Sequence, residues 1–456
     1  MNKLLSTVLA IFLGAYIEVA SGQTDPASQS VDELARARTL LSDRRDRLGP
    51  MDAGLIEPIE QLADQLMSLN QYDEAHDLLD RAMQIARVQN GLYTELQRGL
   101  LTKKIDNFAN RGDWDSAREN MEHLHWLYTQ KSVRVDQALI DDLMNLSQVH
   151  LKGLAEDNSY MQGYHFRKSA QIRWIAQGVA EALWGAADER LVPIVYEQLR
   201  QLHLQTVALY RGGATSYALR RVAPGSEIMR DRGDVNETFY VTGLSFINKL
   251  YTIYAQGEVP NAEAMAMTQV YLADWHILYD QPQLATKTYR QAYRELLAAG
   301  ADASHLNELF SQPMVIPDTE FYVSVDMALT MQQNKLGTQE EDALNPYLSF
   351  SEWSSALPNV RSPISDSATE TQKLDSNFAL FSFSLAGVNR VSRWYSHRYV
   401  STVSMIEQAE ILAHYFEAPP EELQLLEKLN SLTFRPKLVD GEPQQATGRL
   451  KYHFAE

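Results

Sequence analysis

Asn70-Gln-Tyr-Asp-Glu-Ala-His-Asp-Leu-Leu-Asp-Arg-Ala-Met83 is the stretch from which the fold of this chain can be predicted. Apolar residues recur every three or four positions before it, and the same spacing resumes over 72–88. This pattern predicts two helices joined by a tight polar turn. Ala75 and Ala82 fall on the apolar face of the second helix, where small side chains let two helices approach closely.

The same hairpin occurs twice more along the chain. A second copy follows 42 residues later, with Trp114 and Ala117 in the aromatic and small positions, and a third surrounds the turn at 280–283. Repetition of one hairpin predicts an array in which neighbouring hairpins stack on one another. The residues expected to pack between the helices of the copies are Ala63, Tyr72, Ala75, Ala82, Trp114, Ala117, Ala273, Ala285 and Ala292.

These hairpins resemble tetratricopeptide (TPR) repeats, which place an alanine on the second helix and an aromatic residue at the turn. Their period of 42 residues exceeds the ~34 residues of a minimal TPR. The resemblance implies a superhelix with a groove that binds peptides. The predicted fold class is therefore mainly α: a TPR-like helical-hairpin superhelix followed by a small α+β C-terminal module.

The chain divides into segments of different composition. Residues 1–22 have the charged start, apolar core and small-residue end of a secretory signal peptide, and an uncleaved N-terminal anchor is the alternative. After them we expect a helical lead-in at 23–54, TPR-like repeats at 55–130, further helical hairpins at 131–310 with the third copy at 262–299, an irregular or β-containing linker at 311–376, and an α+β module at 377–456.

The region after residue 310 differs from the preceding helical part in amino-acid composition. Residues 321–329 are β-branched and aromatic and predict a strand, while Ser, Thr, Glu and Pro over 333–376 are typical of a linker. In the last segment, strands are expected at 378–385, 390–403 and 448–454, with a helix between them that starts after Pro420.

This order resembles the C-terminal domain of TonB-like energy-transducing proteins. The matching positions are Phe434, Pro436, Gly441 and the closing strand Leu450–Phe454. The resemblance implies an α+β fold and a place in the bacterial periplasm or on the periplasmic face of the outer membrane. A helical array stands here where those proteins have an anchor and a Pro-rich spacer.

Composition argues against several classes of function. The net charge of −18 repels phosphate backbones, so no nucleic-acid partner is expected. The absence of cysteine excludes thiolate catalysis and cysteine-ligated metals. His123 and His125 lack the i, i+4 spacing of helical metal ligands, and no nucleophile-elbow or phosphate-loop motif occurs. We therefore expect a protein that is not an enzyme, with no catalytic residue, metal or cofactor; an enzyme with a site beside residues 313–376 is the remaining alternative.

An aspartate precedes the signature alanine by eleven residues in each hairpin copy. These residues are Asp64, Asp106 and Asp274, and the TPR resemblance implies that this position faces the concave groove. Glu57 and Glu60 add to the first copy. Such a groove would favour a basic or polar peptide, whereas the alternative is a row of carboxylates that only solvate an exposed face.

The sequence therefore predicts an exported cell-envelope scaffold that binds a protein or peptide partner through its helical repeats. The alternative is an accessory of outer-membrane transport or envelope assembly that acts through the TonB-like module, whose strand edge could accept a partner strand. No stretch after the signal reaches the ~18 apolar residues of a membrane span. The oligomeric state does not follow from the sequence.

Overall fold

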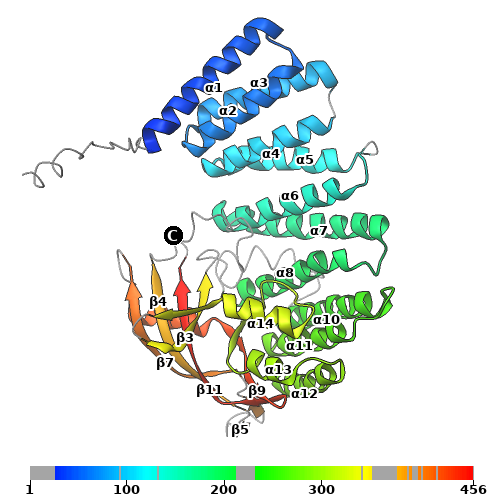
Figure 1. Cartoon of the computed structure of the whole chain (residues 1–456), viewed down its shortest axis with the longest axis vertical. Helices are drawn as coiled ribbons and strands as arrows, with labels where there is room; N and C mark the ends of the chain where they lie inside the picture. The colour runs from blue at the N-terminus through cyan, green and yellow to red at the C-terminus, as the bar shows by residue number, and fades with distance from the viewer. Residues whose placement is uncertain are drawn as a thin grey trace, which may run out of the picture. The chain divides into compact units, whose positions relative to one another are not determined.

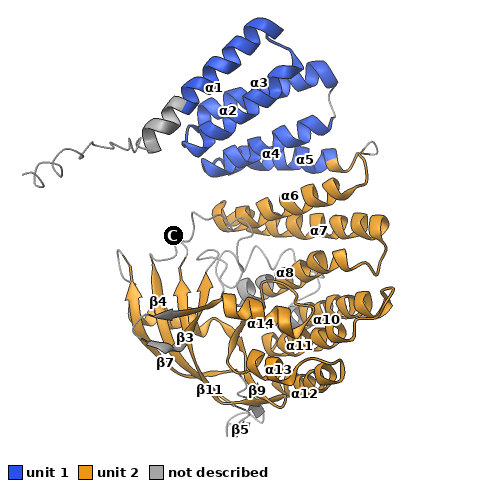
Figure 2. Ribbon diagram, in the orientation of Figure 1, with its two compact units in different colours: residues 1–127 blue, residues 128–456 orange. Residues whose placement is uncertain are grey.

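The computed structural model describes residues 26–91, 94–130, 133–211, 232–339, 342–351, 377–387, 390–392, 399–401, 404–416 and 420–454. The predicted signal peptide at 1–22 lies outside them. The chain forms two compact units, residues 1–127 and residues 128–456 (Figure 2). Helices dominate and a small strand-containing module follows them, which confirms the prediction of a mainly α fold with a small α+β C-terminal module (Figure 1).

Unit 1 is built from helices alone in its described part. They are α1 (Pro26–Leu48), α2 (Ile56–Ser68), α3 (Tyr72–Asn90), α4 (Glu95–Asn110) and α5 (Trp114–Tyr128), with a single 3₁₀ turn at Ala53–Leu55. Helices α2 and α3 form the first hairpin and pack closely, since Ala63, Ala75 and Ala82 are fully buried. Trp114 and Ala117 are buried as well, while Tyr72 is half-buried at the turn.

The three matched hairpins turn in the same way. One residue in each turn has a left-handed backbone: Asn70 (φ 58°), Gly112 (φ 78°) and Asp280 (φ 56°). The next amide donates a hydrogen bond to the carbonyl five residues earlier, as Gln71 to Leu66, Asp113 to Phe108 and Gln281 to His276, over 2.7 to 2.9 Å. This is the Schellman ending of a helix, which satisfies carbonyls that the helix itself leaves unpaired.

Unit 2 continues with helices that pack as consecutive pairs. They are α6 (Gln137–Glu156) with α7 (Gln162–Trp184), α8 (Val192–Arg211) with α10 (Arg232–Gln256), and α11 (Ala262–Leu278) with α12 (Pro282–Ala298). Short 3₁₀ turns at Ser159–Met161 and Glu189–Leu191 precede α7 and α8, and α13 (Ala303–Leu309) and α14 (Val325–Asn334) follow α12. One apolar core runs through these helices, and Ala273, Ala285 and Ala292 belong to it.

A five-stranded sheet forms the rest of unit 2. Its order is β2 (Leu336–Gln339), β3 (Asp342–Ser351), β11 (Ala446–His453), β4 (Phe378–Leu385) and β7 (Ile406–Tyr415). Only the β3–β11 pair is parallel. Helix α16 (Glu422–Asn430) buries Leu425 and Leu429 in the core of this sheet.

Three short strand pairs complete the described part of the module. They are β1 (Met314–Ile316) with β8 (Thr433–Arg435), β9 (Lys437–Val439) with β10 (Glu442–Gln444), and β5 (Arg390–Ser392) with β6 (Tyr399–Ser401). In the sheet β4 pairs with both β11 and β7, whereas the segment expected as one strand at 390–403 forms the short pair β5 and β6 in its described part. On β11, Leu450, Tyr452 and His453 are buried.

The β content expected over 311–376 is present, but the described part of this segment is not a linker. Strands β2 and β3 belong to the sheet of the module, because β3 pairs with the distant β11, a contact that local composition does not reveal. The strand expected over 321–329 is also wrong, since α14 begins at Val325. Ser324 caps this helix by accepting a hydrogen bond from the Met327 amide. Residues 352–376 lie outside the described residues.

Close helix packing in unit 2 depends on Gly243. A Cβ at this position of α10 would lie 2.0 Å from Cζ2 of Trp275 on α11. We expect Gly243→Ala to destabilise the fold by about 1–3 kcal/mol, because Trp275 has to leave its position. Gly178 on α7 is the matched control, since a Cβ there meets nothing within 4 Å. Gly178→Ala should raise the thermal unfolding midpoint, and two variants that melt alike would contradict this account of the packing.

Two buried histidines make stability depend on pH. Burial lowers the pKa of His203 to about 4, and the charge of Arg200 acts in the same direction. Burial also lowers the pKa of His276 to about 4. Because an exposed histidine titrates near pH 6.5, the unfolded chain gains these protons between about pH 7 and 4 while the folded chain does not. The stabilisation is complete above about pH 7 and is lost as pH falls.

Replacement of His203 tests this dependence. Its two ring nitrogens have no hydrogen-bond partner among the described residues, so leucine can take its place without breaking a described hydrogen bond. We expect His203→Leu to flatten the fall in unfolding free energy between about pH 7 and about pH 5, measured by denaturant titration at both values. A wild-type pH dependence that the variant leaves unchanged would contradict the assignment.

Candidate functional site

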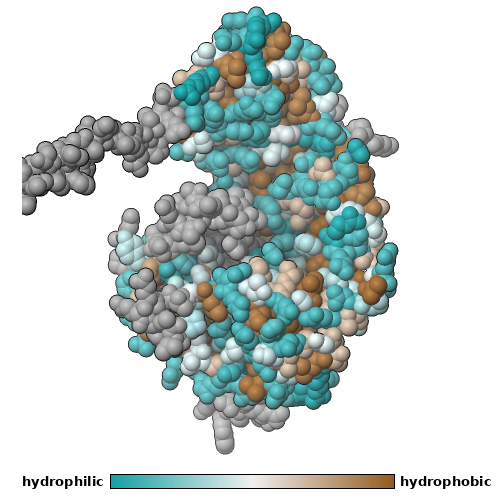
Figure 3. Space-filling model, viewed as in Figure 1, coloured by the Kyte–Doolittle hydropathy of each residue, from teal (hydrophilic) through white to brown (hydrophobic). Residues whose placement is uncertain are grey.

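In unit 1, the predicted groove residues of the first hairpin share one face of α2. Glu57 and Asp64 are exposed and Glu60 is half-buried. Burial raises the pKa of Glu60; the charge of Lys103 opposes this shift, while Asp64 and Glu57 add to it. Hydrophilic side chains cover much of the visible face of this unit (Figure 3). The carboxylates therefore form a polar contact surface.

The first helix of the second hairpin, α4, lies beside this surface. Asp106 is exposed there, as predicted for its position. Lys103, three residues before it, reaches across to α2 and places its Nζ 2.6 Å from a carboxylate oxygen of Asp64. Sequence reasoning missed this lysine, which neutralises part of the acidic face.

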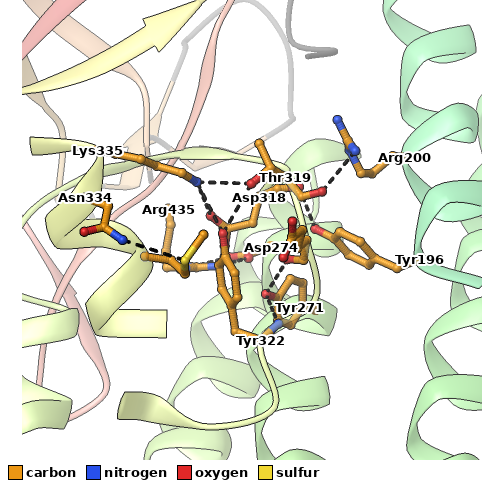
Figure 4. A network of polar contacts seen from close by, with 12 residues as sticks. Tyr196, Arg200, Tyr271, Asp274, Asp318, Thr319, Tyr322, Asn334, Lys335 and Arg435 are labelled. Carbon is orange, nitrogen blue, oxygen red and sulfur yellow. Dashed lines mark hydrogen bonds and ion pairs between the residues drawn. The ribbon is translucent and has the colours of Figure 1, made fainter. Parts of the chain in front are cut away.

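Asp274 corrects the prediction of an open acidic groove in the third copy. It lies on α11 with only 3% of its surface exposed. Nε of Arg435 on β8 donates to Asp274 Oδ1 over 3.0 Å, and Nη2 of Arg435 donates to Oδ2 (Figure 4). The Tyr289 hydroxyl donates to Oδ1 over 2.6 Å. The C-terminal module thus occupies the face that the sequence assigned to an external partner.

A second buried carboxylate shares the same arginine. Asp318 follows β1, and its Oδ2 accepts a hydrogen bond of 2.8 Å from Nη2 of Arg435. Burial acts to lower the pKa of Arg435, but the carboxylates of Asp274 and Asp318 hold it well above its ordinary value. Arg435 is therefore a permanent cation between two carboxylates, which matches the preference of guanidinium for paired acceptors.

The segment after β1 is held through its backbone. Tyr196 of α8 donates its hydroxyl to the carbonyl of residue 318 over 2.9 Å, and Nη1 of Arg200 donates to that of residue 319 over 3.0 Å. Tyr271 of α11 donates to the carbonyl of residue 320 over 2.9 Å. Three successive carbonyls are thus bound by side chains of α8 and α11. Such contacts recognise a peptide backbone whatever its side chains are.

The sequence alone did not identify the partners of Asp274. Arg435 lies between Phe434 and Pro436, two residues of the TonB-like motif, and nothing in that motif relates it to a helix 161 residues earlier. Trp275 of α11 and Tyr279 at its end belong to the core, with exposures of 1% and 4%. The feature of the sequence that pointed to this site was the repeat, because Asp274 stands at the hairpin position that was expected to face a partner.

No group of three or more His, Cys, Asp or Glu side chains among the described residues is arranged to hold a metal ion. None of the helices in this part of the chain combines the length and the hydropathy needed to cross a membrane.

Comparison with known proteins adds little to this description. No family model matches the sequence, and no curated protein matches it. Among solved structures, the chain is similar to BtubC (BKLC) from P. vanneervenii, with 16% identity, a TM-score of 0.31, and coverage of 59% of this chain and 89% of that chain. A likeness this slight carries no argument about fold or function.

The Arg435 ion pairs predict a large loss of stability on truncation. Arg435→Ala leaves the buried Asp274 without its cation and leaves Asp318 with the more distant Lys335 Nζ at 3.8 Å, which should cost about 3–5 kcal/mol. Arg290→Ala is the matched control, because Arg290 also joins a helix to the module, through Glu442, but in an exposed ion pair that should matter far less. Denaturant unfolding of both variants measures the difference, and equal effects would show that the buried network is not needed.

Proposed function

We propose that the protein is an exported cell-envelope scaffold that binds a protein or peptide partner through the first helices of its TPR-like hairpins. The observation that carries this proposal is the contact of Asp274 with Arg435. At this position of the hairpin, the chain itself binds a basic side chain with two charge-assisted hydrogen bonds.

The equivalent positions in unit 1 support the same chemistry. Asp64 and Asp106 each stand eleven residues before the signature alanine of a hairpin with the same turn geometry, as Asp274 does. Both are exposed, and Asp64, which pairs with Lys103, lies beside Glu57 and Glu60 on α2. A partner with arginine or lysine side chains would be attracted by these carboxylates, and an acidic partner would be repelled.

The proposal describes binding rather than catalysis. Side chains of α8 and α11 show how such helices hold a peptide backbone through its carbonyls. The signal-like residues 1–22 and the TonB-like motif support a location in the periplasm or at the outer membrane.

One observation favours a second candidate function, an accessory of outer-membrane transport or envelope assembly that acts through the module. Strand β7 lies at one end of the sheet, and β4 is its one neighbour among the described strands of that sheet. A ten-residue edge strand is suited to pairing with a strand of a partner. Partner binding that persists after the charges on α2 and α4 are reversed would favour this candidate.

Peptide selection tests the scaffold function. A displayed library of random peptides is selected against the mature full-length chain, and the affinities of enriched peptides are measured. We expect the enriched peptides to be basic. We expect the double variant Asp64→Lys with Asp106→Lys to bind them with an affinity lower by about tenfold or more.

The control reverses the same number of charges on the second helices, as Asp77→Lys with Glu119→Lys, at exposed positions of α3 and α5. These changes should leave the affinity nearly unchanged. Enrichment of acidic peptides, or equal weakening in both double variants, would contradict the proposal.

A further inference from the structure

A cleft of about 260 Å³ opens in unit 2 beside the Asp318 segment. One wall contains Arg200 of α8 and Thr319, and the opposite part contains Lys335 at the end of α14. Leu348 and Phe350 of β3 supply apolar surface, and Ser349 lies between them. A concave site with apolar walls and a few convergent polar groups is the usual form of a small-molecule site.

Arg200 brings a positive charge that the described residues do not fully pair. It is 7% exposed, and its Nε has no hydrogen-bond partner among them. Its ion-pair partner Glu197 also faces Arg173 at 3.6 Å, and Nε and Nη2 of Arg173 likewise have no partner there. Two buried arginines thus share one carboxylate. An unbalanced buried cation is costly, and an anion that enters the cleft would compensate it.

Lys335 supplies a second cation with weak internal contacts. Its Nζ lies 3.4 Å from both Thr319 Oγ1 and the Tyr322 hydroxyl, and 3.8 Å from Asp318 Oδ1. The other carboxylate oxygen of Asp318 already accepts from Arg435. Figure 4 shows Lys335 and Arg200 on either side of Thr319. An acceptor placed between them could take hydrogen bonds that the protein itself leaves long or unmade.

We propose that this cleft binds a small organic anion with a carboxylate or phosphate head and a short apolar tail. The head group lies beside Thr319, with Lys335 on one side of it and Arg200 on the other. The tail lies against Leu348 and Phe350. This site is separate from the acidic face of α2 and α4, and its ligand has the opposite charge preference.

Titration calorimetry on the full-length chain tests the site with hexanoate, hexyl phosphate, inorganic phosphate and the neutral hexanol. We expect saturable binding of hexanoate or hexyl phosphate, and the tighter of the two identifies the head group. Hexanol and inorganic phosphate should bind more weakly, because each lacks one half of the recognised structure. Lys335→Gln should lower the affinity for the tighter-binding anion by about tenfold or more.

Lys287→Gln is the control, because this exposed lysine of α12 lies outside the cleft and should leave the affinity unchanged. Arg200→Gln should also lower the affinity for the anion. Its folding is checked by thermal unfolding, because Arg200 donates a hydrogen bond to the segment after β1. Lys335 is more accessible, so its variant keeps the test decisive if Arg200→Gln unfolds. No saturable binding, or an affinity unchanged in Lys335→Gln, would overturn the proposal.

Discussion

The ion pair of Asp274 with Arg435 is the interaction on which the arrangement within unit 2 depends. It joins α11 to β8 across 161 residues of sequence, in a place where both side chains are almost fully buried. Either charge alone would be costly there. Tyr289 and Asp318 use the remaining hydrogen-bonding capacity, and Asp318 in turn anchors the segment that α8 and α11 hold by its carbonyls. The cleft with Arg200 and Lys335 exists because this segment is kept in place.

The hairpins could be predicted, because they follow from interactions between residues close in the sequence. The contacts between distant segments could not be predicted in this way. The turns at Asn70, Gly112 and Asp280 follow from residues that end helices, and the buried alanines follow from helical spacing. The sequence of β3 has no periodicity that distinguishes this strand from a polar linker, so its pairing with β11 could not be predicted. The β-branched residues of 321–329 favour a strand, but Ser324 caps a helix within this segment and α14 forms instead.

The same hairpin position therefore has two states in one chain. In unit 2 it is buried and paired with an arginine of the distant strand β8, and in unit 1 it is exposed, with Asp64 paired to Lys103 of the neighbouring helix. This difference explains why the sequence could indicate a binding face but could not say which copies are open. The two proposals therefore concern ligands of opposite charge: a basic segment for the exposed hairpins, and a small anion for the cleft that contains Arg200 and Lys335.

Site-specific photo-crosslinking from α2 tests the central claim, that the first helices of the open hairpins form the partner-binding face. A photoreactive residue at Gln61, one turn before Asp64, is compared with one at Asp77 on α3, in cells that make the protein. The account predicts a discrete crosslinked partner from position 61, which disappears when Asp64 and Asp106 are changed to lysine. Equal crosslinking from both positions, or a partner captured only from position 77, would contradict it.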